Sequence, residues 1–248
     1  MAATLPLDLA LKDGDFRIVI PVLLTIFFFM IYWFISESGA VRKFFYGRSE
    51  HDTAAVSHFL FAKILGFIAL GLIPLIIFLL LLPAYSMADL GLGFNAGSIS
   101  FTVVSALVLV VLAGISARFT ALKARKFGQF PQIRARVWTR STVAVNIAGW
   151  ALYLIGYELL FRGILLVPLA DRLGIWPAIA VNIALYSAAH IPQGYREAFG
   201  AAPIGLIFCL VTLASGTVWV AIIVHLTMSL TNSFTTMKMN PEIIYRKR

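Results

Sequence analysis

The sequence predicts an all-α, polytopic membrane protein with about seven transmembrane helices, and three observations favour this class. Of its 248 residues, 60% are hydrophobic and only 12% are charged, about half the charged share of a soluble domain. The mean hydropathy is +0.92. Long uncharged stretches recur along the chain, and none shows the period of two that is typical of transmembrane β-strands. These observations exclude a soluble enzyme, a disulfide scaffold and a disordered chain.

The uncharged stretches set the number of spans, because a helix needs about 20 apolar residues to cross the hydrocarbon layer. The stretch 198–237 is long enough for two helices, and Ser215-Gly216 near its middle predicts the turn between them. All spans should be helical, because backbone polar groups cannot stay unpaired in lipid. In chain order, the predicted spans are roughly 17–36, 58–83, 101–119, 142–168, 173–190, 202–215 and 218–236.

The first span is expected to remain in the protein as a membrane anchor. It is too long for the core of a signal peptide, and the charged residues before it are not net positive. These residues are Asp8, Lys12, Asp13 and Asp15. The single cysteine, Cys209, lies inside the sixth span, which excludes disulfides and cysteine-based metal sites.

Three basic segments carry most of the net charge of +9 and predict the topology. They comprise Arg42, Lys43 and Arg48; Arg118, Lys123, Arg125, Lys126, Arg134, Arg136 and Arg140; and Lys238, Arg246, Lys247 and Arg248. With seven spans, all three segments fall on one side, which the positive-inside rule makes cytoplasmic. We therefore expect the N-terminus outside, the C-terminus in the cytoplasm, and the cytoplasmic membrane of a bacterium as the location.

The basic loop before residue 141 is the one break in the organisation of the chain. It predicts an N-terminal region of three helices with the loop (1–140), a core of four helices (141–237) and a basic tail (238–248). The loop also carries aromatic residues, namely Phe119, Phe127, Phe130 and Trp138, which is compatible with nucleic-acid binding. A juxtamembrane basic cluster explains the same residues through anionic lipid. Membrane lipids are therefore expected partners, and nucleic acid is not.

Four ionisable side chains lie inside the predicted spans, where each costs about 2.5–3.5 kcal/mol on insertion scales. They are Glu158, Arg162, His190 and His225. Glu158 and Arg162 have the spacing of a helical ion pair, which could be purely structural. Each histidine alone favours an interhelical hydrogen bond. Together the four residues predict one internal polar site, whereas Lys63 is expected near a span end, with its ammonium reaching the interface.

The depths of these side chains allow them to meet. At a rise of 1.5 Å per residue, Glu158, His190 and His225 lie within about 10 Å of one another in depth. Pro168 and Pro192 could bend the neighbouring helices. His190 shares a helical face with Tyr186 and Asn182, and His225 shares one with Ser229 and Asn232.

Three segments resemble, in order, the motifs of the CAAX protease and bacteriocin-processing family of intramembrane proteases. Tyr157-Glu158-Leu159-Leu160-Phe161-Arg162-Gly163 is similar to a motif in which three residues separate a Glu-Glu pair from Arg. Tyr186-Ser187-Ala188-Ala189-His190 resembles an aromatic residue followed four positions later by His. His225 with its following residues resembles a His followed four positions later by Asn or Asp. The resemblance covers about residues 143–235. In the first three spans, only Leu90-Gly91-Leu92 shows a weak similarity to the family.

The resemblance implies hydrolysis of a peptide bond inside the membrane, in a membrane-associated or lipidated substrate. In the family, the first Glu and the second-motif His activate a water, while the third-motif His and Asn stabilise the oxyanion. A carboxylate in apolar surroundings and donors aimed at an oxyanion suit these roles. Some members have been described as zinc enzymes, but no His-Glu-x-x-His pattern occurs here. We therefore expect no cofactor, with zinc as the lesser alternative.

Two positions depart from the family pattern. Tyr157 stands in place of the first Glu, and Ser229 in place of the third-motif Asn, which Asn232 one turn later could replace. A tyrosine hydroxyl is a poor base at neutral pH. Glu158 lies about 100° around the helix from Tyr157, so it does not simply replace the missing carboxylate.

Two hypotheses follow from this pattern. In the first, the chain is an endopeptidase: Glu158 or a water held by Tyr157 is the base, His190 orients the water, and His225 with Ser229 binds the oxyanion. Arg162 supports Glu158. In the second, the chain is a catalytically inactive pseudoprotease that serves as a structural or binding subunit, with a transmembrane protein as its partner. A transporter is disfavoured, because the sequence has no inverted repeat.

Overall fold

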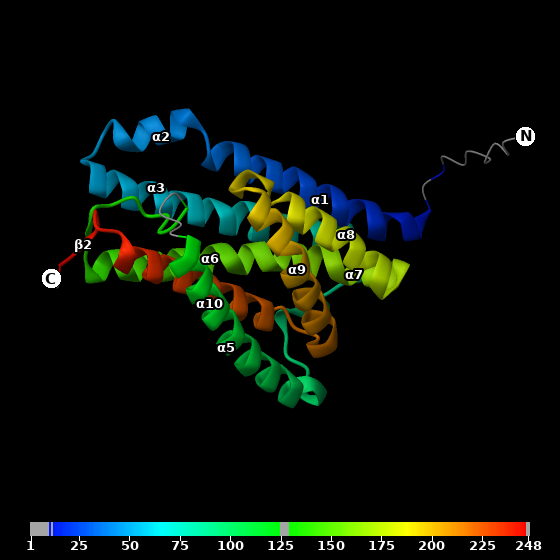
Figure 1. Cartoon of the computed structure of the whole chain (residues 1–248). Coiled ribbons are helices and arrows are strands. Elements are labelled where there is room, and N and C mark those ends of the chain that lie inside the picture. The colour runs from blue at the N-terminus through cyan, green and yellow to red at the C-terminus, as the bar shows by residue number, and fades with distance from the viewer. Residues whose placement is uncertain (1–9, 11, 125–128, 247–248) are drawn as a thin grey trace, which may run out of the picture.

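The computed structural model describes residues 10, 12–124 and 129–246, and helices make up nearly all of their regular structure (Figure 1). The elements are α1 (Asp13–Ser36), α2 (Gly39–Tyr46), α3 (His51–Gly66), η1 (Phe67–Leu72), α4 (Ile73–Leu81), η2 (Ala88–Leu92), η3 (Ala96–Ser98), α5 (Ile99–Ala124), β1 (Val137–Trp138), α6 (Arg140–Glu158), η4 (Leu159–Leu166), α7 (Val167–Leu173), α8 (Ile175–Ala188), η5 (Ile191–Gln193), α9 (Tyr195–Ser215), α10 (Trp219–Met239) and β2 (Ile244–Tyr245). Of the residues cited above, Asp8, Arg125, Lys126, Phe127, Lys247 and Arg248 lie outside the described part.

Within the described residues, seven helical segments are long and apolar enough to cross a membrane, which confirms the predicted all-α class and the number of spans. They are Gly14–Ser36, His51–Leu81, Ala88–Lys123, Arg140–Leu173, Ile175–Gln193, Tyr195–Ser215 and Trp219–Met239. The chain is therefore an integral membrane protein. Several segments begin earlier than predicted, since helices continue through polar residues such as His51 and Tyr195 that we had placed outside the hydrocarbon.

The fourth span forms the centre of the molecule, and the other helices pack around it. It is one continuous helix made of α6, η4 and α7, and η4 is a π-helix whose residues are all buried. Helices α1, α3 and α4 contact it, and so do α8, α9 and α10. Helix α5 packs mainly on α10 and projects away from the bundle, so most of its apolar side chains face outward.

Glycines let the second span approach the central helix closely. A Cβ atom added at Gly71 would lie 2.7 Å from the Gly156 Cα, so backbone meets backbone at this crossing. Small residues at such a crossing are typical of membrane helices. Gly156 directly precedes Tyr157, so this contact fixes the part of α6 that carries the candidate site residues.

The predicted turn between the last two spans is confirmed. Gly216 ends α9 in the left-handed conformation, with φ of +71°, which a glycine adopts without strain. The segment Leu90-Gly91-Leu92, the weak match to the family outside its main region, packs against the start of α10. The Gly91 carbonyl accepts from the Val218 N–H at 2.9 Å and from the Thr217 hydroxyl at 3.0 Å. This segment therefore anchors the start of the helix that carries His225.

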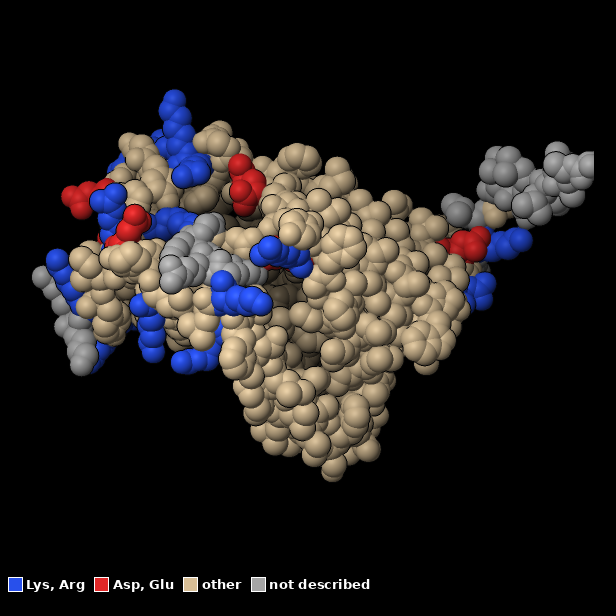
Figure 2. Space-filling model, viewed as in Figure 1, with Lys and Arg blue, Asp and Glu red and all other residues tan. Residues whose placement is uncertain are grey.

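The two ends of the bundle differ in charge. Lys and Arg side chains gather at the end where α2, the start of α3 and the C-terminal strand lie, far from the start of α1 (Figure 2). At this end β1 pairs in parallel with β2, and the Asp52 carboxylate accepts from the Arg136 and Val137 N–H groups at 2.9 and 2.8 Å. The basic segments thus share one end, as seven spans require, while the side of the membrane stays a prediction.

The opposite end is tied together by one carboxylate. Asp171 of α7 accepts from the Tyr85 hydroxyl at 2.9 Å and from Arg17 of α1 at 3.2 Å. Partial burial and the hydrogen bond to Asp171 raise the pKa of Tyr85 to about 12, so its hydroxyl remains a donor throughout the neutral range.

The expectation that Lys63 reaches the membrane interface is wrong. Its side chain is only 3% exposed, because α3 begins at His51 and places Lys63 near the middle of a long span. The ammonium lies 3.4 Å from the centre of the Trp150 ring and 4.2 Å from that of Tyr153. Aromatic faces thus stabilise this cation, through their quadrupoles, in place of water.

We predict that Lys63→Glu strongly lowers the thermal stability of the protein in detergent. The substitution places a carboxylate against aromatic faces that repel it, in a buried position without a cation, at a cost of about 3 kcal/mol or more. Lys63→Arg is the control and keeps the cation. Equal unfolding temperatures for the two variants would contradict the aromatic cage.

Candidate active site

Glu158, Arg162 and His225 form a buried network that joins the central helix to α10. Oε1 of Glu158 lies 2.5 Å from Nδ1 of His225, and Oε2 lies 3.3 Å from Nε of Arg162. Glu158 and Arg162 are completely buried, whereas the His225 side chain is 16% exposed. The predicted ion pair is present as a 3.3 Å contact, although Oε2 of Glu158 and Nε of Arg162 do not form a hydrogen bond with each other. Glu158 reaches His225 because α6 and α10 pack directly together.

Asn182 of α8, which the sequence placed on the helical face of His190 without a role, contacts Arg162 from the other side. Its Oδ1 accepts from Nη1 of Arg162 and from the Cys209 thiol at 3.2 Å, while its Nδ2 donates to the Phe161 carbonyl at 2.5 Å. Phe161 lies in η4, where the π-helical backbone departs from the usual hydrogen-bond pattern. The signal that could have identified Asn182 is its position, an amide inside an apolar span.

His190 is held by the backbone of its own helix. Its Nδ1 lies 2.8 Å from the Tyr186 carbonyl oxygen. Since a carbonyl only accepts, Nδ1 carries the hydrogen, and Nε2 of the neutral ring keeps its lone pair. The same reasoning applies to His225, whose Nδ1 donates to the Glu158 carboxylate. In the neutral form of either ring, Nε2 is therefore the nitrogen that accepts.

Tyr157 lies between the two imidazoles. Its ring centre is 6.3 Å from that of His190 and 5.9 Å from that of His225, with both pairs nearly perpendicular. Tyr157 is 3% exposed, so its ring fills the space at the position of the missing first Glu. The structure thus brings together five predicted site residues from three spans, namely Tyr157, Glu158, Arg162, His190 and His225. Their similar predicted depths in the membrane are compatible with this arrangement.

The two remaining candidate residues lie further along α10. Ser229 is one turn beyond His225 and buried, and Asn232 follows nearly one turn later, with its Oδ1 buried and without a hydrogen-bond partner in the described part of the chain. The described hydrogen bonds do not connect Ser229 to Glu158 or Arg162. Ser229 and Asn232 therefore extend the polar face of α10 away from the network.

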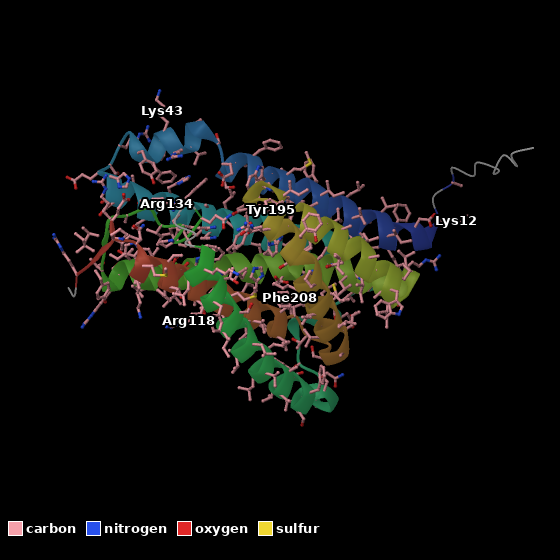
Figure 3. All side chains as sticks on the ribbon, viewed as in Figure 1. Lys12, Lys43, Arg118, Arg134, Tyr195 and Phe208 are labelled. Atoms are coloured by element: carbon pink, nitrogen blue, oxygen red, sulfur yellow. The ribbon has the colours of Figure 1, made fainter. Side chains whose placement is uncertain are left out.

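Figure 2 shows a hollow in the surface between α9 and the α5–α10 pair. Phe208 of α9, labelled in Figure 3, packs beside the site: its ring centre lies 5.8 Å from that of His225 and 5.5 Å from the Arg162 guanidinium. Among the described residues, no group of three or more His, Cys, Asp or Glu side chains is placed to hold a metal ion.

A comparison with known protein families finds a match, and it covers the helices that carry this site. Residues 137–231 match the family model described as type II CAAX prenyl endopeptidase, Rce1-like. This match, over 95 of the 248 residues, supports the resemblance to the CAAX protease and bacteriocin-processing family that the motifs predict for this part of the chain. No curated protein and no solved structure matched the chain significantly.

The family match includes every residue of the network and leaves out the first three spans. It begins at β1 and ends within α10, so α6, η4, α7, α8 and α9 all lie inside it. Tyr157 and Ser229 are the positions at which this part of the chain departs from the family motifs.

We predict that Asn182→Leu destabilises the protein by about 3–5 kcal/mol, because it leaves a buried guanidinium without its acceptor and the Phe161 carbonyl without its donor. Thermal unfolding in detergent measures this loss. Cys209→Ser is the matched control, since it keeps a donor beside Asn182. The role given to Asn182 is wrong if both variants unfold at the wild-type temperature.

Proposed function

We propose that the chain is an intramembrane endopeptidase that hydrolyses a peptide bond of a membrane-associated or lipidated substrate. The supporting observation is the pair of imidazoles, from separate helices, that flank Tyr157 and each have Nδ1 engaged and Nε2 available. Such groups act as acids and bases near neutral pH. The buried Glu158–Arg162 pair supports one of them.

In this proposal, His190 is the general base. Its Nε2 takes a proton from a water as the water oxygen attacks the carbonyl carbon of the scissile bond. The same proton then passes to the leaving nitrogen, the C–N bond breaks, and a carboxylic acid and an amine are released. Glu158 is not assigned the base role, because both of its oxygens already contact Arg162 and His225.

The oxyanion of the tetrahedral intermediate is assigned to His225 and Tyr157. Glu158 accepts from Nδ1 of His225, and in the imidazolium form of this ring the Nε2–H group donates to the oxyanion. The Tyr157 hydroxyl is a second donor, and Ser229 a more distant third. Donors held in place in surroundings of low dielectric stabilise such charge by several kcal/mol. No step requires a metal ion.

We predict that His190→Gln lowers cleavage at least about 100-fold, the contribution of a general base, without loss of folding. The assay measures peptides released from a library of prenylated peptides by the protein in proteoliposomes. His58→Gln is the control, because His58 is a membrane histidine outside the family match. Full activity of His190→Gln would contradict the mechanism.

One observation favours a second function, that of an inactive scaffold within a membrane complex. The Tyr157 ring fills the space between the imidazoles, where the family places a carboxylate. If the chain is a scaffold, wild type releases no peptide, Tyr157→Glu gains cleavage, and a stoichiometric membrane partner co-purifies in mild detergent. Cleavage by wild type would exclude this function.

Location and topology belong to the proposal as well. We propose the cytoplasmic membrane of a bacterium, with the basic end in the cytoplasm and anionic lipid headgroups around it. The concentration of Lys and Arg at one end of the bundle supports this orientation.

A further inference from the structure

Residues 129–138 precede α6 as an irregular segment, which we call the strap, and they are anchored in the bundle. Ile133 and Trp138 are 0% exposed and lie in the apolar cluster that includes Trp150 of α6. The Phe130 ring stacks on the Trp150 ring, with centres 6.2 Å apart. The end of the strap also pairs with β2. These contacts fix the position of the strap against α6.

The turn that follows His190 has no comparable anchor in the core. Helix α8 ends at Ala188, so the backbone of His190 belongs to the turn rather than to a helix. The His190 N–H donates to the Ser187 carbonyl at 3.0 Å, and the His190 carbonyl accepts from the Gln193 N–H at 3.0 Å. The three residues after His190 are all exposed. Packing against the core therefore does not hold this turn in place.

The strap reaches the turn through Gln129. Nε2 of Gln129 donates to the Gln193 carbonyl at 2.7 Å, across 64 residues of sequence. Of the hydrogen bonds within the described part of the chain, this one joins the turn 191–194 to a distant segment. Gln193 thus contacts Gln129 through its carbonyl oxygen and His190 through its N–H group. The anchored strap is in this way connected to the backbone of His190.

We propose that Gln129 is a positioning residue for His190. The inference rests on the proposed function, in which Nε2 of His190 takes a proton from water. The Tyr186 carbonyl fixes one edge of the imidazole, and the bond from Gln129 fixes the backbone from which the ring projects. A general base must lie within hydrogen-bond reach of the proton that it removes. Gln129 lies outside the family match, which begins at residue 137.

The nitrogen-15 NMR signals of the His190 ring, recorded in lipid bilayers, test this position without any cleavage assay. Gln129→Leu removes the donor and keeps a side chain of similar length. We expect the His190 signals to shift or split, because the turn is no longer held, and those of His225 to stay unchanged. Gln132→Leu is the matched control, since Gln132 is an exposed glutamine of the same strap. Unchanged His190 signals in Gln129→Leu, or equal shifts in both variants, overturn the proposal.

A rescue variant separates the loss of the donor from a general disturbance of the strap. Gln129→Lys supplies an ammonium that can donate to the Gln193 carbonyl. We therefore expect the His190 signals of this variant to return toward those of the wild type. Gln129→Asn, whose amide is one methylene shorter, provides a second loss of the bond if Gln129→Leu does not fold. Equal displacement of the signals in Gln129→Lys and in the loss variant would show that the hydrogen bond does not position the ring.

Cleavage kinetics in proteoliposomes give the second measurement. We expect Gln129→Leu to lower kcat by up to about 100-fold, the cost of a misplacement on the order of 1 Å, with KM nearly unchanged. If the wild type cleaves and Gln129→Leu keeps its kcat, the role of Gln129 is wrong while the protease proposal stands. If the wild type cleaves nothing, the protease proposal fails, and the NMR comparison still decides whether Gln129 positions His190.

Discussion

The structure depends on the burial of two opposite charges, Glu158 and Arg162, in the interior of a membrane protein. Neither is exposed, and a charge in this position must be matched by its surroundings. Asn182 accepts from Arg162, the Tyr186 ring lies 4.3 Å from the guanidinium, and His225 donates to Glu158. These partners come from α8 and α10, so the ion pair determines how these helices must pack against the centre.

The same constraint explains why the fourth span is the most buried helix. A helix that carries a Glu and an Arg cannot face lipid, and all of η4 is buried. The contact between Gly71 and Gly156 brings the second span against it, and the Leu90-Gly91-Leu92 segment covers η4 and the start of α10. The candidate catalytic residues therefore lie on closely packed helices rather than on loops.

Much of this arrangement follows from the sequence, and the exceptions have physical reasons. Hydropathy predicted seven spans, and the spacing of Glu158, His190 and His225 predicted one polar site. Periodicity could not show the bond from Asn182 to the Phe161 carbonyl in the π-helix η4, because that bond joins two different helices. Lys63 was misplaced because its aromatic partners, Trp150 and Tyr153, lie about 90 residues away in the chain. The place of Tyr157 between the imidazoles also required the relative positions of three helices.

The central claim is that His190 presents an unprotonated Nε2 to the space beside Tyr157. Nitrogen-15 NMR of histidine-labelled protein in lipid bilayers tests it directly, because the chain has only four histidines and each signal can be assigned by substitution. At a pH where the His190 ring is neutral, we predict that it carries its hydrogen on Nδ1. A hydrogen on Nε2 of His190 would contradict it, since that nitrogen could then accept no proton from water.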